Sequence, residues 1–335
     1  MRVAINGFGR IGRAIFRSAI ERKIPIAVIN NPRGVKDAEY LLKYDSIYGK
    51  FPGKVETKGS YLIVNGKKIL VISQRDITKL PWRELKIHTV IESTGVFKDR
   101  KSLNQHFKSG AKKVIVTAPS EGVDITVVMG VNEDKLDKSD KIISVASCTT
   151  NALAPVTKIL MDNFGVKNEL MTTIHAYTSS QHLVESSDEK PRRGRSATLN
   201  LIPTSTGASI AVEKVLPKIK GKISGLAIRV PVAVVSLVDI VAQSNKTTNV
   251  NELKRIFKKV SKKEMKGIVG YTEEDLVSSD FIGDTRSAII DGKSIQVEGE
   301  LVKVLVWYDN EWGYSNRVLD VANLFSKKIG QKKGK

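Results

Sequence analysis

The chain has 335 residues, of which 41% are hydrophobic and 27% charged, so we expect a folded protein of about two domains rather than a disordered one. Its single cysteine, Cys148, excludes an internal disulfide framework and a multi-cysteine zinc site, and four histidines leave little material for a metal centre, so no metal is expected. The net charge of +20 predicts attraction to anions, which include phosphorylated metabolites, nucleic acid and membrane surfaces.

The first half of the chain alternates between short apolar runs and helical patterns. The apolar runs predict six strands, at residues 3–6, 24–30, 61–64, 68–72, 88–92 and 113–117. Helical spacing places Ile11, Ala14, Ile15 and Ala19 on one face, and a second helix is expected at residues 103–111. Alternating strands and helices predict an α/β domain with a mostly parallel sheet that is covered on both faces.

The second half has longer strands and fewer helices. A helix is predicted at residues 151–164 and another at 250–263, and the strands are expected at residues 169–176, 224–230, 237–243 and 302–308. This order favours an α+β domain whose sheet is antiparallel, with helices on one face. We therefore predict a first domain at residues 1–148, a catalytic domain at 149–313, and a C-terminal helix within 314–335 that returns to the first domain.

A glycine-rich motif, Gly7-Phe8-Gly9-Arg10-Ile11-Gly12, lies between the first predicted strand and the helix that follows it. In this context G-x-G-x-x-G predicts a tight turn, a close approach to a pyrophosphate and close packing of the helix on the strand. The helix N-terminus offers free N–H groups to the phosphates. We therefore predict a Rossmann domain that binds a dinucleotide, with a ligand-free glycine turn as the alternative.

The adenosine end of the cofactor site is predicted from the second strand. Such domains usually carry an acidic residue there for the ribose hydroxyls, but the position 19 residues after Gly12 (31 − 12) is Asn31. An amide bonds a ribose without repelling a 2′-phosphate, and Arg33 adds a cation, as does Arg75. We therefore expect NADP as the preferred cofactor, with NAD as the other candidate. The alternative is a simple turn at residues 31–34.

Two residues are candidates for covalent catalysis. Cys148 lies in Ser147-Cys148-Thr149-Thr150-Asn151 at the start of a predicted helix, where the helix N-terminus lowers a thiol pKa and favours a thiolate nucleophile. His175 ends a predicted strand and is the best available general base. The alternatives are an inert core cysteine and a strand-end histidine with no chemical role.

Four segments together resemble phosphorylating glyceraldehyde-3-phosphate dehydrogenase. They are residues 6–13, 147–151, 175–178 and 307–314, they occur in the family's order, and the resemblance spans essentially the whole chain. It implies a homotetramer of two-domain subunits that acts on glyceraldehyde 3-phosphate and inorganic phosphate in glycolysis or gluconeogenesis. Residues 232–235 are more similar to the NADPH-preferring, gluconeogenic branch of the family.

The resemblance also implies a mechanism. Cys148 would attack the aldehyde to give a hemithioacetal, and His175 would take the hydroxyl proton as hydride leaves for the nicotinamide. Phosphate would then release 1,3-bisphosphoglycerate from the thioacyl enzyme. The residues expected to bind the two phosphate groups are Thr178 and Arg229 for the substrate, and Ser147, Thr149, Thr206 and Gly207, with Arg193 nearby, for the attacking phosphate. The residues expected to bind the cofactor are Gly7, Gly9, Arg10, Ile11, Gly12, Asn31, Arg33, Arg75, Thr117, Ser187, Asn310 and Tyr314.

Besides residues 232–235, three places in the chain depart from the family pattern. Ser179-Ser180 replaces Asn-Asp after Thr178, Ser186-Ser187 replaces Leu-Pro in the following loop, and Ala152 stands where a second cysteine is common. None of these changes removes a catalytic residue. Ser186 and Ser187 add hydroxyl donors that a neighbouring subunit's cofactor could use, which favours NADP.

Two other functions compete with this interpretation. Erythrose-4-phosphate dehydrogenase shares the nucleophile and base, but it tends to lose the threonine matching Thr178 and the pair matching residues 206–207, all of which are present here. A polyanion-binding protein would use the +20 charge. The basic residues lie on a predicted helix face at 254–266 and in the tail at 327–335, without interleaved aromatic residues, so nucleic acid is expected only as a weak side activity.

The cellular location is predicted from three negative observations. The chain starts without a charged-then-apolar leader, and its longest strongly apolar stretch, residues 230–238, is about half of a membrane span and contains a proline. With one cysteine, no disulfide is expected. We therefore predict a cytoplasmic protein that does not bind a membrane.

Overall fold

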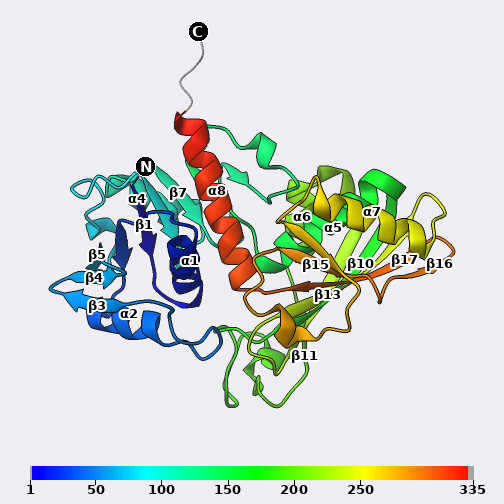
Figure 1. Cartoon of the computed structure of the whole chain (residues 1–335), viewed down its shortest axis with the longest axis horizontal. Coiled ribbons are helices and arrows are strands. Elements are labelled where there is room, and N and C mark those ends of the chain that lie inside the picture. The colour runs from blue at the N-terminus through cyan, green and yellow to red at the C-terminus, as the bar shows by residue number, and fades with distance from the viewer. Residues whose placement is uncertain (1, 331–335) are drawn as a thin grey trace, which may run out of the picture. The chain divides into compact units, whose positions relative to one another are not determined.

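The computed structural model describes residues 2–330, which form two compact units (Figure 1). The first unit contains the described residues up to 127, residues 133–146 and the described residues from 315; the second contains residues 128–132 and 147–314. Ser147 and Cys148 therefore belong to the second unit, whereas the sequence placed them in the first, because they begin a helix that packs on the second sheet. Residues 331–335 of the predicted tail lie outside the described residues.

The first unit is built on a sheet of nine strands among the described residues. The strands are β1 (Val3–Asn6), β2 (Val28–Asn30), β3 (Val55–Lys58), β4 (Tyr61–Val64), β5 (Lys67–Ile72), β6 (Thr89–Glu92), β7 (Lys113–Val116), β8 (Ile125–Thr126) and β9 (Ile142–Ser144). Their order is β3-β4-β5-β2-β1-β6-β7-β9-β8, and only β3–β4 and β4–β5 pair antiparallel. The predicted mostly parallel sheet and its hairpin are confirmed.

The chain order reverses at β1, which pairs with β2 on one side and β6 on the other. In open parallel sheets ligands bind in the crevice at such a switch point, outside the carboxyl ends of the strands. The buried strand residues here include Ala4, Val28 and Val90, which share a core cluster with Trp82. The sheet therefore presents the ends of β2, β1 and β6, which are Asn30, Asn6 and Glu92, along one edge.

The helices of the first unit are α1 (Arg10–Glu21), α2 (Gly34–Lys43), α3 (Arg100–Leu103), α4 (Gln105–Lys108) and, from Ser315 on, α8 (Trp312–Gly330). Two predictions are corrected here. The strand expected at residues 24–30 shortens to β2, because Pro25 has no N–H for the ladder. The helix expected at residues 103–111 is two short helices that begin earlier, because the Asp99 side chain caps the N–H of Ser102.

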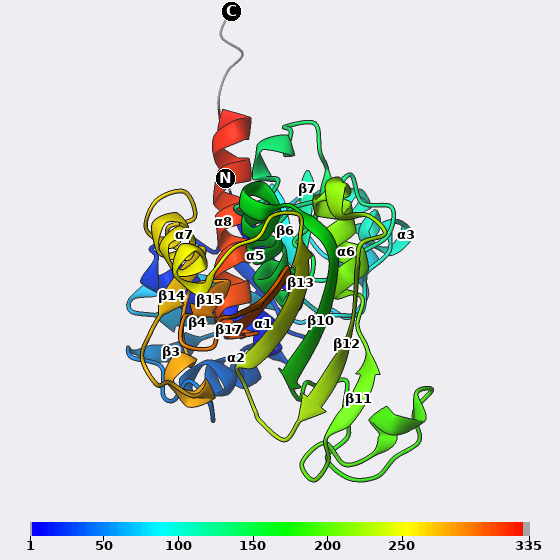
Figure 2. The same ribbon diagram turned by 90° about the vertical axis from the view of Figure 1, so that its right-hand side faces the viewer.

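The second unit is built on a mixed sheet of eight strands among the described residues. They are β10 (Val166–Ala176), β11 (Ile202–Ser205), β12 (Ile223–Val230), β13 (Ser236–Ser244), β14 (Val269–Thr272), β15 (Ala288–Asp291), β16 (Gln296–Glu298) and β17 (Leu301–Tyr308). Figure 2 shows β12, β10 and β13 running side by side. The expected antiparallel sheet is corrected at two pairs, since β10–β12 and β14–β15 are parallel. A long crossover joins β10 to β12, which is the connection that parallel strands require.

Helices α5 (Cys148–Phe164), α6 (Ala208–Val215) and α7 (Val250–Lys262) lie on one face of this second sheet (Figure 1). Helix α5 is almost entirely buried, and its partner strand β10 follows it after a turn at Gly165. Gly165 has a φ of 69°, and a Cβ there would collide with the Asn245 side chain, so the turn requires glycine. No helix of the described residues is long and apolar enough to cross a membrane.

Candidate active site

The thiol of Cys148 is held at the first residue of α5. Ser147 caps this helix, because its Oγ accepts a hydrogen bond from the N–H of Thr150 at 3.1 Å. The Cys148 side chain is half-buried, and its Sγ lies 3.5 Å from Nε2 of His175 and 4.0 Å from the Thr149 hydroxyl. The two residues that the sequence singled out for covalent chemistry are therefore in contact, although 27 positions separate them.

His175 is fixed by the end of β10 and by Arg229 of β12. The two residues are direct partners in the parallel register of these strands. Nδ1 of His175 lies 2.7 Å from the carbonyl oxygen of Ala176 and 2.7 Å from Nη1 of Arg229, which itself donates to that carbonyl at 2.9 Å. The carbonyl oxygen can only accept and the guanidinium can only donate, so the two contacts at Nδ1 favour opposite tautomers; with the proton on Nδ1, Nε2 is an acceptor that faces the thiol.

Burial sets the charge state of this pair. It raises the pKa of the Cys148 thiol, against the opposing effects of the Arg229 charge and the Thr149 hydroxyl. Burial and then the Arg229 charge lower the pKa of His175 to about 3. Both directions favour a neutral thiol beside a neutral imidazole. Burial of the thiol thus opposes the lowering of its pKa that the sequence predicts from the helix N-terminus.

Tyr308 is a site residue that sequence reasoning missed. Its hydroxyl is 3.0 Å from the Thr149 Oγ1 and 2.8 Å from the Thr173 Oγ1, and its ring meets the edge of His175 at 6.0 Å between centroids. Burial raises the pKa of the Tyr308 hydroxyl, which keeps it a neutral donor. Tyr308 lies in the segment at residues 307–314 that resembles the family. The sequence signal for its role is the alternation of buried and more exposed residues along β17, which turns Tyr308 inward.

The residues expected to bind phosphate are only partly brought together. Arg229 reaches His175, and Thr149 reaches the thiol, as described above. Arg193 donates from Nε to Thr204 at 2.8 Å, in the strand that leads to Thr206, and Gly207 begins α6 with open space where a Cβ would lie. Thr178 bonds Ser180 at 2.9 Å. These side chains offer arginine, hydroxyl and backbone donors, which are the groups that bind phosphate.

The glycine-rich turn has the shape that a dinucleotide requires. Gly7 has a φ of 96°, and a Cβ there would meet the backbone of Ser93 and Thr94 within 3 Å. A Cβ at Gly12 would lie 2.0 Å from the Gly7 carbonyl oxygen, whereas one at Gly9 would meet nothing within 4 Å. The three glycines therefore serve a tight turn, close helix packing and an open approach for a pyrophosphate, and the residues fit the cofactor. Ile11 is half-buried in the first turn of α1.

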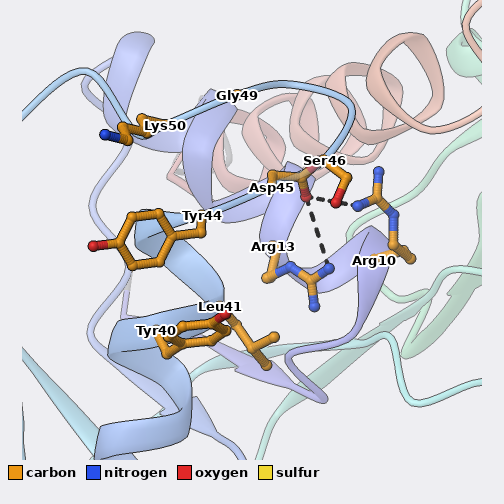
Figure 3. Close-up of a pocket in the computed structure, with 9 residues that line it drawn as sticks. All are labelled: Arg10, Arg13, Tyr40, Leu41, Tyr44, Asp45, Ser46, Gly49 and Lys50. Atoms are coloured by element: carbon orange, nitrogen blue, oxygen red, sulfur yellow. Dashed lines mark hydrogen bonds and ion pairs between the residues drawn. The ribbon is translucent and has the colours of Figure 1, made fainter.

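Arg10, which the sequence assigned to the cofactor, bonds Asp45 at 2.6 Å, and Arg13 lies 3.8 Å from the same carboxylate. Together with Tyr40 and Tyr44 they line a pocket of about 460 Å³ beside α1 (Figure 3). The carboxylate also accepts the N–H groups of residues 47 and 48. Arg10 therefore holds the loop after α2 through its side chain.

The adenosine end of the site differs from the sequence prediction. Asn31 donates from Nδ2 to the Gly34 carbonyl at 3.0 Å and to the Asp37 carboxylate at 2.9 Å. A carboxylate therefore does lie beside the end of β2, although it comes from α2 rather than from the position that the motif predicts. Arg33 and Arg75 are exposed on two neighbouring loops, which the Ser73 hydroxyl joins by donating to the Pro32 carbonyl at 2.7 Å.

Four further cofactor candidates lie on different elements. Thr117 follows β7 and donates to the Glu92 carbonyl at 3.1 Å in the first unit. In the second unit, Asn310 accepts from the Ser236 hydroxyl at 3.2 Å, and burial raises the pKa of Tyr314. Ser187 is exposed on the loop between β10 and β11.

Two family models match the chain. Residues 1–100 match the glyceraldehyde 3-phosphate dehydrogenase NAD binding domain, and residues 147–310 match the glyceraldehyde 3-phosphate dehydrogenase C-terminal domain. The chain belongs to the glyceraldehyde 3-phosphate dehydrogenase family. The resemblance drawn from the four sequence segments is thereby confirmed, as is the class of NAD-dependent, phosphorylating dehydrogenase.

Similar members of the family come from distant organisms. Glyceraldehyde-3-phosphate dehydrogenase 1 of Kluyveromyces marxianus is 50% identical over 323 residues, which cover 95% of this chain and 98% of the relative. Glyceraldehyde-3-phosphate dehydrogenase 1 of Bacillus subtilis (strain 168) is 48% identical over 331 residues, covering 98% and 99%. The enzyme of Geobacillus stearothermophilus is 46% identical with the same coverage. The family likeness therefore extends over both units.

Proposed function

We propose that this chain oxidises glyceraldehyde 3-phosphate and phosphorylates it to 1,3-bisphosphoglycerate, and catalyses the reverse reaction, through a covalent intermediate on Cys148. The observation that carries the proposal is the 3.5 Å contact of the Cys148 Sγ with His175 Nε2. A nucleophile within reach of a base that a third group orients is the arrangement of covalent catalysis, and here the Ala176 carbonyl orients the base.

The first half-reaction follows from the charge states of the pair. As the Cys148 sulfur attacks the aldehyde carbon, His175 Nε2 takes the thiol proton and passes it to the carbonyl oxygen, which gives a hemithioacetal. His175 then accepts the hydroxyl proton while the C–H bond breaks and the C=O bond of the thioester forms. The glycine-rich turn would hold a nicotinamide cofactor, which would supply the hydride acceptor for this step.

The second half-reaction needs an anion beside the thioester. An oxygen of inorganic phosphate attacks the acyl carbon, the C–S bond breaks, and the sulfur regains its proton from His175. Arg193 and the α6 N-terminus at Gly207 supply donors of the kind that bind the attacking phosphate, while Arg229 and Thr178 supply those for the substrate phosphate.

The test is an assay of the purified chain with glyceraldehyde 3-phosphate, with and without inorganic phosphate, beside erythrose 4-phosphate. Phosphate should stimulate steady turnover of the first aldehyde. Cys148→Ser should abolish it, because a hydroxyl is a poor replacement for the thiol, and Ser139→Ala on an exposed turn should leave it unchanged. Faster turnover of erythrose 4-phosphate without phosphate stimulation would favour the alternative dehydrogenase.

We also propose that the chain uses NADP as well as NAD, in a gluconeogenic as well as a glycolytic direction. Exposed Arg33 and Arg75 on linked loops favour a 2′-phosphate, whereas the Asp37 carboxylate beside Asn31 opposes it. Asp37→Ala should therefore raise kcat/KM for NADP, and Arg33→Ala should lower it. A parent enzyme that favours NAD by tenfold or more, about 1.4 kcal/mol, would contradict this part of the proposal.

A homotetramer is the proposed assembly. Glu169 faces α5 through Thr157, so its neighbour Leu170 points to the opposite face of the second sheet, where it is 63% exposed. Leu226 of the adjacent β12 is 45% exposed. Two large exposed apolar side chains on neighbouring strands are typical of a face that another subunit covers. Light scattering after gel filtration should give four times 36.9 kDa, and Leu170→Asp with Leu226→Asp should give a smaller species.

The remaining expectations complete the proposal. The one cysteine carries no disulfide, which suits the reducing cytoplasm, and fractionation of the source cells tests that location. The +20 charge supports only a weak association with nucleic acid, and binding that survives 200 mM salt would contradict this.

A further inference from the structure

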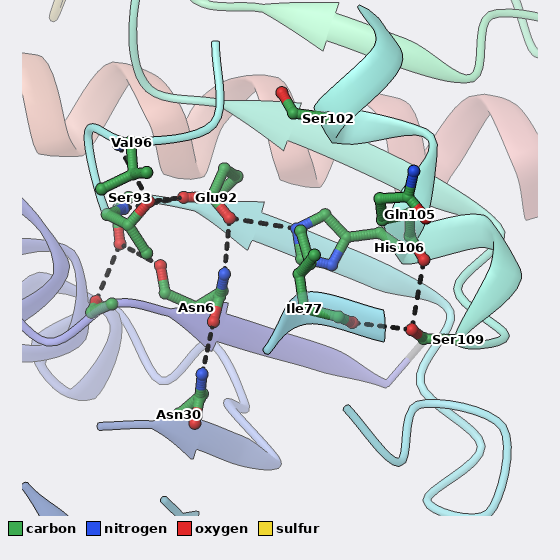
Figure 4. Close-up of polar contacts among 12 residues, drawn as sticks. Asn6, Asn30, Ile77, Glu92, Ser93, Val96, Ser102, Gln105, His106 and Ser109 are labelled. Carbon is green, nitrogen blue, oxygen red and sulfur yellow. Dashed lines mark hydrogen bonds and ion pairs between the residues drawn. The ribbon is translucent and has the colours of Figure 1, made fainter. Parts of the chain in front are cut away.

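Polar side chains form a buried row across the ends of three parallel strands in the first unit (Figure 4). Asn30 of β2 donates to Asn6 of β1 at 2.7 Å, and Asn6 donates to Glu92 of β6 at 2.6 Å. The three residues are direct partners in the strand register, and each is at most 3% exposed. The row lies at the switch point of the sheet, directly behind the glycine-rich turn.

At the Asn30 end of the row, the backbone of Gln74 determines which side-chain atom donates and which accepts. The Oδ1 of Asn30 accepts the Gln74 N–H at 3.0 Å, and its Nδ2 donates to the Gln74 carbonyl at 2.8 Å. Because these backbone groups cannot exchange roles, Nδ2 of Asn30 must also face Asn6 as a donor. Asn6 then accepts with Oδ1 and donates with Nδ2, so the Glu92 oxygen that it meets must accept.

The other end of the row is fixed by an indole. Nε1 of Trp82, which can only donate, lies 3.0 Å from Nδ1 of His106. His106 therefore accepts at Nδ1 and carries its proton at Nε2, which is 3.0 Å from the same Oε2 of Glu92. The N–H and the hydroxyl of Thr94 both donate to Oε1. Glu92 thus receives four donors, two on each of its oxygens.

None of these four donors comes from lysine or arginine, so the Glu92 carboxyl group is held by hydrogen bonds rather than by a cationic partner of that kind. Burying a carboxyl group in this way is costly, and a site retains it when the arrangement of the donors matters. Three of the donors belong to the two segments that border the crevice, and the fourth, His106, belongs to α4. Asn6 precedes the pyrophosphate turn, and Thr94 begins the loop at residues 94–96, where its hydroxyl also accepts the N–H of Val96 at 3.1 Å.

The neighbouring Ser93 ties the same two segments together. Its hydroxyl donates to the Gly7 carbonyl at 2.9 Å and contacts the Asn6 carbonyl at 3.1 Å. The positive φ of Gly7 and the short distance from that residue to the Thr94 backbone leave little room for either segment to move alone. A change in the charge of Glu92 therefore changes the turn and the loop together.

We propose that Glu92 is a positioning residue for the dinucleotide. Its buried carboxylate draws the start of the pyrophosphate turn and the loop at residues 94–96 into the arrangement that binds the cofactor. This inference rests on the dinucleotide binding that the proposed function assumes. It assigns a task to Glu92, His106 and Trp82, which the sequence motif for this fold does not contain.

The test is the Kd of NAD, measured by calorimetry on the purified chain, for Glu92→Gln beside the parent. An amide in place of the carboxylate turns one acceptor into a donor, which would face either the donors of Asn6 and His106 or the backbone N–H of Thr94, none of which can accept it. The Kd should rise at least tenfold, which corresponds to about 1.4 kcal/mol, while kcat at saturating NAD falls less than threefold. An unchanged Kd would overturn the proposal.

Two control variants separate positioning from general loss of stability. Leu62→Ala removes a fully buried side chain from β4 of the same sheet, and Glu169→Gln makes the same chemical change at an equally buried carboxyl in the second unit. Both should keep the Kd within twofold of the parent, whatever their melting temperatures. If Leu62→Ala weakens NAD binding as much as Glu92→Gln does, the role of Glu92 is only structural.

A milder variant keeps the test decisive if Glu92→Gln does not fold. Thr94→Val removes one of the four donors, retains the side-chain shape and leaves the Glu92 carboxyl group in place. It should raise the Kd about threefold, and a Kd equal to that of the parent would overturn the proposal. A parent chain that does not bind NAD would contradict the proposed function itself, whereas binding that is insensitive to these variants would contradict only the role of Glu92.

Discussion

Arg229 contacts His175 at the ring nitrogen that faces away from the thiol. Its charge is the second cause, after burial, of the low pKa of His175. We expect Arg229→Leu to raise that pKa above about 3 but to leave it below its ordinary value, because burial is unchanged. Titration of the ¹⁵N-labelled imidazole by NMR measures this. Arg193→Leu, at an arginine that bonds Thr204 and Ser205 instead, should leave the titration where it is in the parent.

Glu169 gives the protein a second pH dependence. It is almost fully buried, with one bond from the Thr157 hydroxyl at 2.7 Å, and burial raises its pKa to about 7. The folded state therefore holds this proton more tightly than the unfolded state, so the contribution of Glu169 to stability is complete below pH 4.5 and is lost as the pH rises through 7.

The resulting prediction concerns Glu169→Gln. Between pH 4.5 and 8 the parent should lose about 3 kcal/mol of unfolding free energy that the variant does not lose, since each pKa unit corresponds to about 1.4 kcal/mol. Urea denaturation at a series of pH values measures the difference between the two proteins. A difference that stays constant over this range would show that Glu169 does not titrate there.

At the scale of residues, the sequence could predict the pair that the structure brings into contact but not the direction of its pKa shifts. Cys148 and His175 were identified from residue type and local context, and the structure places them in contact. The direction of their pKa shifts depends on burial and on Arg229, which comes from another strand 54 residues away. Asp37 was missed for a related reason, since its carboxylate reaches the end of β2 from the next helix.

At the scale of elements, the turn between β1 and α1 allows a sharp comparison of two glycines. Gly12→Ala should destabilise the first unit by several kcal/mol and abolish dinucleotide binding, because its Cβ would lie 2.0 Å from the Gly7 carbonyl oxygen. Gly9→Ala should keep the melting temperature within a few degrees, because its φ of −73° suits alanine and nothing lies within 4 Å of the new Cβ.

The same Gly9→Ala change should still weaken NAD binding at least tenfold, since a methyl group would stand where the pyrophosphate approaches. Calorimetric unfolding and NAD titration of both variants distinguish the two roles. Equal losses of stability in the two proteins would contradict the division of tasks between the glycines.

Elements defined by local patterns were predictable, and those defined by pairing were not. The alternation in β13 and β17 and the helical spacing in α1 and α7 are visible in the sequence, and these elements lie within a few residues of their predicted bounds. The parallel pairing of β10 with β12 depends on a crossover through β11 and α6. The apolar content of β12 resembles that of any other strand. Local sequence carries no signal for such a partner.

At the scale of the whole molecule, charge is the dominant property. The net charge of +20 attracts anionic substrates over a distance that salt shortens, from about 30 Å at 0.01 M to about 8 Å at 0.15 M. We expect kcat/KM for glyceraldehyde 3-phosphate to fall several-fold over this range at saturating NAD and phosphate. Unphosphorylated glyceraldehyde, which is neutral, should show no such fall. An equal fall of kcat/KM for both aldehydes would mean that salt acts on the enzyme itself rather than on its electrostatic attraction for the anionic substrate.

The placement of Cys148 at the first residue of α5 and of His175 near the last residue of β10 has a consequence for how this chain tolerates insertions and deletions. The two elements are consecutive, so one helix–strand unit carries both reactive groups at its open end. Removing one residue from α5 rotates the sulfur by about 100° around the helix axis, and removing one from β10 turns the imidazole to the opposite face of the sheet. Lengths in residues 148–175 should therefore be nearly invariant in functional variants of a deletion library, whereas the exposed segment at residues 183–185 should accept changes of length.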